Sequence, residues 1–142
     1  MSKKSLNTAA GRKLFKQLQV PEQIPVKFTY DGREYRGFGR FPVLERKTTS
    51  TSCVLRFQID ENMEAELDAA FCPEFGEVEH KIWFRNTGTG PTKCLTALYA
   101  YTDNIHGKAP MLRGCLGDHD NYYSQYCRDL SKEKEIFFSS TW

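Results

Sequence analysis

The chain contains an Asp31-Gly32 pair between two segments in which apolar and polar residues alternate. Asp-Gly is a favoured central pair of tight hairpin turns. The upstream segment, Val26–Tyr30, alternates as a half-buried strand does. The sequence therefore predicts an antiparallel hairpin. Its returning strand is expected from Arg33 to about Glu45, with Pro42 marking a bulge or a sheet edge.

Periodicity and turn signals divide the rest of the chain. Strands are predicted at 53–59, 77–85, 93–102, 111–112 and 136–138. Helices are predicted from Asn7 or Thr8 to about residue 19, at 61–71 after an Asp60 cap, and at 118–130. This order indicates an α+β fold around a mostly antiparallel sheet, with an open barrel as one form of that sheet. We expect residues 1–6 to be disordered and residues 7–142 to form a single domain.

Composition limits the class of protein. The chain has 142 residues, of which 39% are hydrophobic and 13% aromatic, enough for an ordered core. Its net charge is +2 and its pI about 8.3, so any nucleic-acid surface is expected to be a local patch. Arg12, Lys13 and Lys16 give the first predicted helix a basic side. No apolar run approaches membrane-spanning length, and the polar start lacks a signal-peptide core, which favours a cytoplasmic protein.

The five cysteines are widely spaced and contain no C-x-x-C pair, so a disulfide framework is not expected. Most are interpreted as small buried apolar groups. A zinc site built from Cys115, His119 and Cys127 would still need a fourth ligand, such as Cys94 or His106. The sequence predicts no metal or cofactor.

The segment from Arg33 to Phe41 is the strongest indication of a partner. Arginines alternate with aromatic residues, and two glycines separate them. Flat rings can stack on bases while guanidinium groups hold phosphates. In a regular strand Arg33, Tyr35 and Phe41 share one face, and Arg36, Phe38 and Arg40 the other. One face is therefore expected to belong to the core.

Arg36-Gly37-Phe38-Gly39-Arg40-Phe41 resembles, over about six residues, the aromatic ribonucleoprotein motif of RNA-recognition domains. The family has an aromatic residue at the position of Arg40, and it places a helix before the hairpin that carries the motif. This chain instead joins its strands through Asp31-Gly32. The family is therefore not assigned, and only the chemistry of stacking beside arginines is retained.

A second candidate is the loop Gly88-Thr89-Gly90-Pro91-Thr92-Lys93. Backbone amides at glycines, threonine hydroxyls and the ammonium group of Lys93 can cradle a phosphate, with Arg85 just upstream. The spacing is not that of a nucleotide-binding P-loop, and a plain hairpin turn is the competing interpretation.

Glu79-His80-Lys81 has the E-x-K spacing of metal-dependent nucleases, in which carboxylates bind magnesium and the lysine stabilises the attacking hydroxide. Such sites also need an upstream aspartate. Asp68 is eleven residues before Glu79, but it lies in a segment predicted to be helical.

Together these patterns predict a module that binds nucleic acid or a phosphate-bearing nucleotide without catalysis of its own. The expected ligand-binding residues are Arg33, Tyr35, Arg36, Phe38, Arg40, Phe41, Arg85, Thr89 and Lys93. Two alternatives stay open. One is a metal-dependent nuclease that uses Glu79 and Lys81, and the other is an interaction or inhibitor protein that docks on a protein partner through exposed aromatics.

Overall fold

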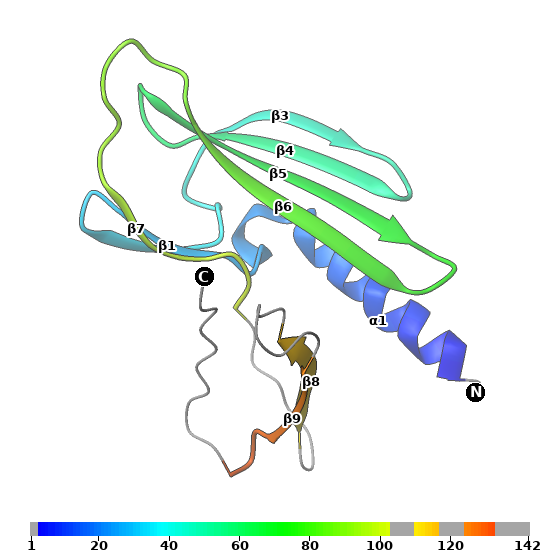
Figure 1. The fold of residues 1–142 in the computed structure, drawn as a ribbon. Coiled ribbons are helices and arrows are strands. Elements are labelled where there is room, and N and C mark those ends of the chain that lie inside the picture. Colours follow the sequence, from blue (N-terminus) through cyan, green and yellow to red (C-terminus); the bar gives the residue numbers. More distant parts are fainter. Residues whose placement is uncertain (1–2, 103–109, 117–123, 133–142) are drawn as a thin grey trace. The chain divides into compact units, whose positions relative to one another are not determined.

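The computed structural model of the chain describes residues 3–102, 110–116 and 124–132. Contacts group the chain into two compact units, residues 1–102 and residues 103–142, and each is described by itself. In the described residues, unit 1 holds one α-helix, a 3-10 turn and two sheets, and unit 2 holds a hairpin (Figure 1). The predicted α+β class and the mostly antiparallel sheet are confirmed.

The smaller sheet of unit 1 has the order β2-β1-β7, from β1 (Lys27–Tyr30), β2 (Arg33–Arg36) and β7 (Leu95–Tyr99), all antiparallel. Asp31 and Gly32 connect β1 to β2 with φ angles of 52° and 74°. Two successive positive φ angles define the mirror-image turn that suits the twist of paired strands. The hairpin predicted from Asp31-Gly32 is confirmed, with Tyr30 opposite Arg33.

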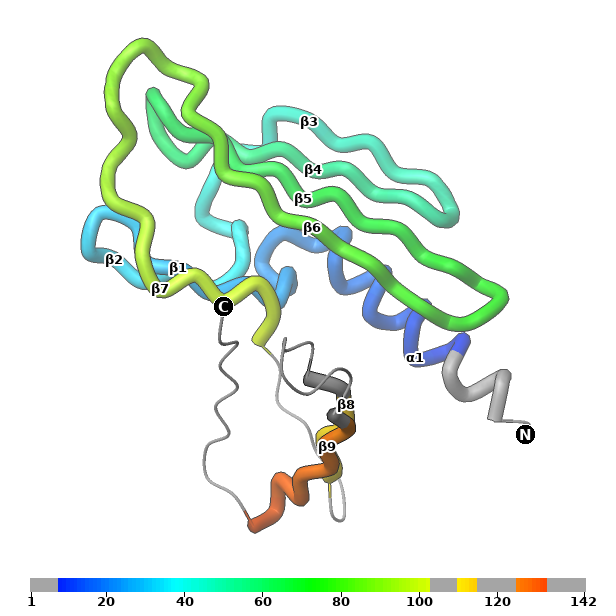
Figure 2. Tube along the Cα trace, in the orientation of Figure 1, coloured from blue at the N-terminus to red at the C-terminus, as the bar shows by residue number. Residues whose placement is uncertain are grey.

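The larger sheet is an antiparallel meander in the order β3-β4-β5-β6, shown in Figures 1 and 2. Its strands are β3 (Val43–Thr48), β4 (Ser52–Gln58), β5 (Met63–Cys72) and β6 (Glu77–Asn86). Every second residue of β4 and β5 is buried. We call the face that carries these buried side chains the inner face, and the opposite, largely polar face the outer face.

Helix α1 (Lys3–Leu18) lies across the inner face against β5 and β6 (Figures 1 and 2). Phe15 and Leu18 are buried there, and Phe15 stacks on Phe71 with ring centroids 5.7 Å apart. Gly11 lets the helix approach the β5–β6 turn, since a Cβ atom at Gly11 would lie 2.0 Å from the carbonyl oxygen of Gly76. The 3-10 turn η1 (Pro21–Gln23) follows.

The core of unit 1 centres on the Phe28 ring. Ring centroids of four other aromatic residues lie 5.3–6.1 Å from it. They are Tyr35, Phe38, Phe41 and Phe84. These residues come from both sheets and from the connection between them, so aromatic packing joins the two sheets.

A polar contact joins β1 to the β4–β5 turn. The Tyr30 hydroxyl donates to Asp60 Oδ2 at 2.6 Å, and Asp60 Oδ1 accepts from the backbone amides of Asn62 and Met63 at 2.9 Å each. The Tyr30 hydrogen bond holds the pKa of Asp60 below its ordinary value. Burial and the same bond raise the pKa of Tyr30. The Tyr30 hydroxyl also accepts from the Lys93 amide at 3.2 Å.

Unit 2 is described as an antiparallel hairpin of β8 (Met111–Leu116) and β9 (Ser124–Asp129). Its register pairs Met111 with Asp129 and Leu116 with Ser124. Beyond the strands, the Leu130 amide donates to the Pro110 carbonyl at 2.9 Å. The short strand predicted at 111–112 is thereby confirmed and extended.

Two predicted helices are corrected. Residues 63–72 form β5, so the helix predicted at 61–71 is wrong. The helix predicted at 118–130 is wrong over Ser124–Asp129, which is β9, while residues 117–123 and the strand predicted at 136–138 lie outside the described residues. Among the sheets that the structure describes, none closes on itself, so the open barrel is not supported. The strands predicted at 53–59, 77–85 and 93–102 are confirmed as β4, β6 and β7, the last shorter than expected.

Candidate nucleic-acid interface

The arginine and aromatic segment does not form one strand. β2 ends at Arg36, the chain turns through residues 37–42, and β3 begins at Val43. Gly37 has a φ of +63°, and the Gly37 and Phe38 amides donate to the carbonyls of Val26 at 2.9 Å and Pro21 at 2.7 Å. The continuous strand predicted from Arg33 to Glu45 is therefore wrong, because the chain leaves one sheet at this turn and enters the other.

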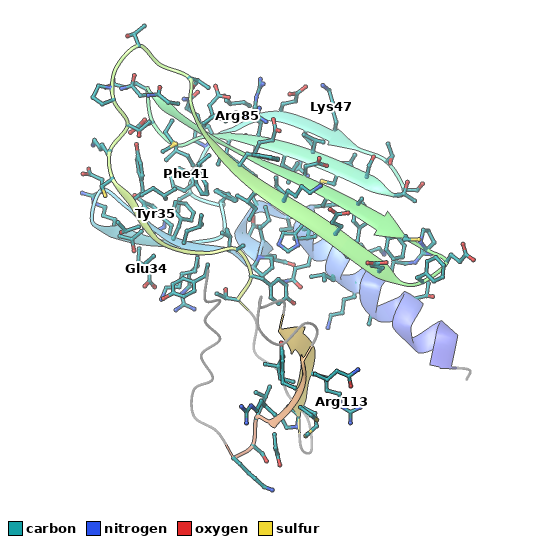
Figure 3. All side chains as sticks on the ribbon, viewed as in Figure 1. Glu34, Tyr35, Phe41, Lys47, Arg85 and Arg113 are labelled. Carbon is teal, nitrogen blue, oxygen red and sulfur yellow. The ribbon has the colours of Figure 1, made fainter. Side chains whose placement is uncertain are left out.

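The three aromatic rings of this segment pack inward. Phe38 is fully buried and stacks on Phe57 with centroids 4.6 Å apart and planes 12° from parallel. Tyr35 and Phe41 are half-buried and 4.9 Å apart (Figure 3). Both also pack against Phe28. The rings therefore belong to the core, and Phe38 is not accessible to a base.

The three arginines of the segment are exposed. Arg36 contacts Glu34 at 3.4 Å, and Glu34 also pairs with Lys27 at 2.8 Å. The Lys27 contact is the main reason that the pKa of Glu34 is lowered. Among the described residues, Arg33 and Arg40 have no ion-pair partner. The cations thus point outward while the rings point inward.

The glycine-threonine loop is held closed by two asparagines. The amides of Thr87 and Gly90 donate to Asn62 at 3.0 and 3.3 Å, and the Gly88 amide donates to Asn86 Oδ1 at 3.1 Å. A Cβ at Gly88 would lie 1.9 Å from Asn62 Oδ1. Gly88 therefore leaves space for the Asn62 side chain. The backbone amides of Thr87, Gly88 and Gly90, which a bound phosphate would need, already donate hydrogen bonds within the protein.

The charged residues beside this loop are also paired. Arg85 contacts both carboxylate oxygens of Glu66, at 3.0 and 3.4 Å, and Lys93 Nζ donates to Asp31 at 2.8 Å. The bond to Asp31 raises the pKa of Lys93. Thr89 is exposed. Arg85, Thr89 and Lys93 thus remain at the surface, but both cations would have to release a carboxylate to bind a phosphate.

Helix α1 presents a set of cations that the predicted site did not include. Arg12, Lys13 and Lys16 are exposed, and Arg12 lies over the Phe71 ring at 5.6 Å. Lys13 and Lys16 have no ion-pair partner among the described residues. We call these three residues the α1 basic face. The sequence signal was available, because Lys3–Leu18 contains five lysines and arginines and no acidic residue.

Contacts at the C-terminal end of α1 bring further arginines near this face. Arg46 Nη1 donates to the Gln19 carbonyl at 2.8 Å, where it satisfies a carbonyl left open just beyond the helix end. The turn between Arg36 and Arg40 packs on η1, since a Cβ at Gly37 would lie 2.8 Å from the Pro21 carbonyl oxygen. Arg46 of β3 therefore lies at the C-terminal end of α1, and the turn that carries Arg40 lies against the 3-10 turn that follows the helix.

The outer face carries the residues of the nuclease alternative. Asp68 lies on β5 directly opposite Lys81 of β6, and Glu79 lies two residues away on the same face. The prediction that Asp68 is helical is wrong, and strand pairing brings these three residues together around a cavity of about 60 Å³. Lys81 pairs with Glu79 at 3.0 Å, which raises the pKa of Lys81.

The described part of the chain holds neither a cluster of metal ligands nor a membrane-spanning helix. It contains no group of three or more His, Cys, Asp or Glu residues that could hold a metal ion. Of the suggested zinc ligands, Cys127 and Cys94 are exposed, while His119, His106 and the side chain of Cys115 lie outside what is described. None of the helices described there is long and apolar enough to span a membrane.

Comparison with other proteins adds no assignment. No model of a known protein family, no curated protein and no solved structure matches the chain significantly.

Proposed function

We propose that this protein is a non-catalytic module that binds nucleic acid through the phosphate backbone. The observation that carries the proposal is the separation of rings from cations. Phe38 is buried and Tyr35 and Phe41 pack on the core, whereas the flanking arginines and the α1 basic face are exposed. Exposed cations beside rings that are buried or half-buried favour phosphate contacts over base stacking.

The charge of α1 supports this proposal. The helix carries +5 while the whole chain carries +2, so the other residues together carry −3. Its first turn has no acidic residue, although acidic side chains there would complement the helix dipole. Lys13 and Lys16 have no carboxylate partner among the described residues. This distribution does little for the stability of the helix and is well suited to an anionic partner.

Fluorescence anisotropy with labelled single-stranded DNA, RNA and duplex DNA tests the proposal over a range of salt concentrations. We expect binding that depends little on sequence, with an affinity that falls by roughly the second to fourth power of the salt concentration for three or four phosphate contacts. A mononucleotide should compete poorly, because it offers only one of these contacts.

Lys16→Glu and Lys47→Glu form a matched pair for this assay. Both side chains are exposed, but Lys47 projects from the outer face, away from α1 (Figure 3). Lys16→Glu should reduce the slope of log affinity against log salt concentration by about one, the amount expected for one lost phosphate contact, and Lys47→Glu should leave this slope unchanged. Equal effects of the two substitutions, or no binding at low salt, would rule out the α1 basic face as the interface.

The same assay measures how much each of the other predicted cations contributes to binding. Neutral replacements of Arg33, Arg36 and Arg40 should each weaken binding modestly if the turn beside η1 continues the surface. Replacing Arg85 or Lys93 should have little effect, because each is already paired with a carboxylate. A larger loss from Arg85 or Lys93 than from Lys16 would move the interface to the glycine-threonine loop.

A second candidate function is metal-dependent cleavage of nucleic acid, which the shared outer-face position of Asp68, Glu79 and Lys81 favours. The two carboxylates would hold the metal ion and Lys81 would stabilise the attacking hydroxide. Plasmid and RNA are incubated with magnesium or manganese, and Glu79→Ala is compared with Glu77→Ala on the same strand. Cleavage that only Glu79→Ala abolishes would support this activity, and cleavage unchanged in both variants would exclude it for Glu79.

A further inference from the structure

Among the described residues, no strand pairs with the second edge of β6, where the nearest polar contact is that of His80 Nε2 with the Ala100 carbonyl oxygen at 3.2 Å. All ten residues of β6, Glu77–Asn86, pair in register with β5 on one side. Among the described residues, none of them makes a backbone hydrogen bond to any other segment. Strand edges of this length are templates for pairing with another strand, and proteins usually interrupt them.

The opposite edge of the sheet is interrupted in this way. β3 has six residues, follows Pro42, and contains a register shift between Val43 and Glu45. Proline and bulges protect an edge from added strands. β6 has neither of these features, so the two edges of the same sheet differ in their capacity to pair.

The side chains of β6 are complementary to a second copy of the strand. Two antiparallel copies related by a twofold axis bring residues of the same face opposite each other. When Ile82 faces Ile82, Glu79 faces Arg85 and Lys81 faces Trp83, each twice. Opposite charges and a cation beside an aromatic ring are favourable cross-strand pairs.

Neighbouring registers are less favourable. Centring the pair on Lys81 places the two Lys81 side chains opposite each other, and centring it on Trp83 places Lys81 opposite Arg85. Like charges in these positions are destabilising. Centring it on His80 also places Glu79 opposite Lys81, but it shortens the paired segment to 77–83 and places Glu77, rather than a cation, opposite Trp83. The Ile82 register pairs residues 78–86 without a like-charge contact.

We infer that the protein forms a homodimer in which two β6 strands pair antiparallel about Ile82 and join the two sheets into one. Trp83 is 49% exposed in the single chain, and its neighbour Arg85 lies over the ring at 5.9 Å. The dimer exchanges two ion pairs of the single chain, that of Lys81 with Glu79 and that of Arg85 with Glu66. The partner's Lys81 then covers the Trp83 ring, and Arg85 pairs with the partner's Glu79. This inference does not rest on the proposed function, because none of the cross-strand pairs involves a residue of α1.

Sedimentation velocity and light scattering of the full chain over a wide concentration range test the dimer. The wild-type protein should show a monomer–dimer equilibrium. Glu79→Arg should weaken it roughly tenfold or more, because two opposite-charge pairs become two like-charge pairs. Combining Glu79→Arg with Arg85→Glu should restore dimerisation. Circular dichroism of each variant establishes that it is folded.

Glu77→Arg is the matched control. Glu77 lies on the same face of the same strand but has no partner within β6 in the Ile82 register. Its replacement should therefore leave the dimerisation constant unchanged. A wild-type protein that is monomeric at every concentration would overturn the inference. A Glu77→Arg variant that is weakened as much as Glu79→Arg would overturn the Ile82 register.

Discussion

Single glycines decide where this chain turns. Asp31-Gly32 could be predicted as a hairpin because its signal is local. The role of Gly37 could not, because it depends on η1, whose Pro21 carbonyl lies where a side chain would be. A strand pattern continues through Gly37 in the sequence, and only the approach of a distant segment shows that the strand ends there. For the same reason the inward position of Phe38 was missed in the candidate site.

Replacing Gly37 with alanine should destabilise unit 1. Its φ is +63°, and the added Cβ would lie within 3 Å of two backbone carbonyl oxygens. We expect a loss of about 2–4 kcal/mol in the free energy of unfolding, measured by urea denaturation. Gly32→Ala is the control, with a φ of +74° but open space around it, and should lose about 1 kcal/mol. Equal losses would show that contact with η1 contributes nothing.

Asp60 should make stability depend on pH. Because its pKa is lowered in the folded protein, mainly by the Tyr30 hydroxyl, its contribution is present above its ordinary pKa of about 3.9. The contribution is lost as the pH falls through the lower folded pKa. Asp60→Asn should lose about 1–2 kcal/mol at neutral pH and show a smaller decrease in stability on acidification. Melting curves between neutral and acidic pH measure this difference, with exposed Asp68→Asn as control.

Among the elements, β5 shows how tertiary packing overrides local preference. Its residues, Met63–Cys72, include three alanines, two glutamates and a leucine, which favour helices. The structure instead buries every second residue from Met63 to Phe71. The alternation of apolar and polar residues was present in the sequence, but Ala65 and Ala69 are small and give only a weak hydrophobic signal at two of the buried positions. The correct strand also brings Asp68 beside Lys81, which a helix would not have done.

Ala69 and Ala70 provide a test of β5 with adjacent residues. Ala69 is buried and Ala70 is exposed on the outer face. Ala69→Thr should destabilise the protein by about 2 kcal/mol, because it adds volume and an unpaired hydroxyl to the core. Ala70→Thr should change stability by less than about 0.5 kcal/mol, because threonine suits an exposed strand position. Chemical denaturation measures the free energy of unfolding of the two variants. A larger loss for Ala70→Thr than for Ala69→Thr would contradict the strand assignment of β5.

At the scale of the molecule, the described core lies entirely within unit 1. The buried residues and those packed against them extend from Leu14 to Leu95. Thr102 ends this unit with a backbone hydrogen bond of 2.6 Å to the Pro25 carbonyl. The sequence contained a continuous series of strand and helix signals through residue 138 and no linker composition, so it offered no basis for dividing the chain.

A chain that ends at Thr102 should fold. We expect it to keep a cooperative thermal transition and a circular dichroism spectrum dominated by strands, because no described core residue is removed. Calorimetry of this chain and of the full-length protein compares their transitions. Loss of the cooperative transition would instead support the prediction of one domain from residue 7 to residue 142.

The pairing of β1 with β7 has a consequence for the order of folding. Lys27 pairs with Tyr99, whereas successive strands of the meander are joined by short turns. Contacts between neighbouring strands close short loops and form early, while distant contacts form late. During synthesis the meander can therefore assemble before β7 has left the ribosome and can pair with β1. Until then the edge of β1 that β7 covers has no pairing partner, which makes this interval the stage at which a chaperone would be most useful.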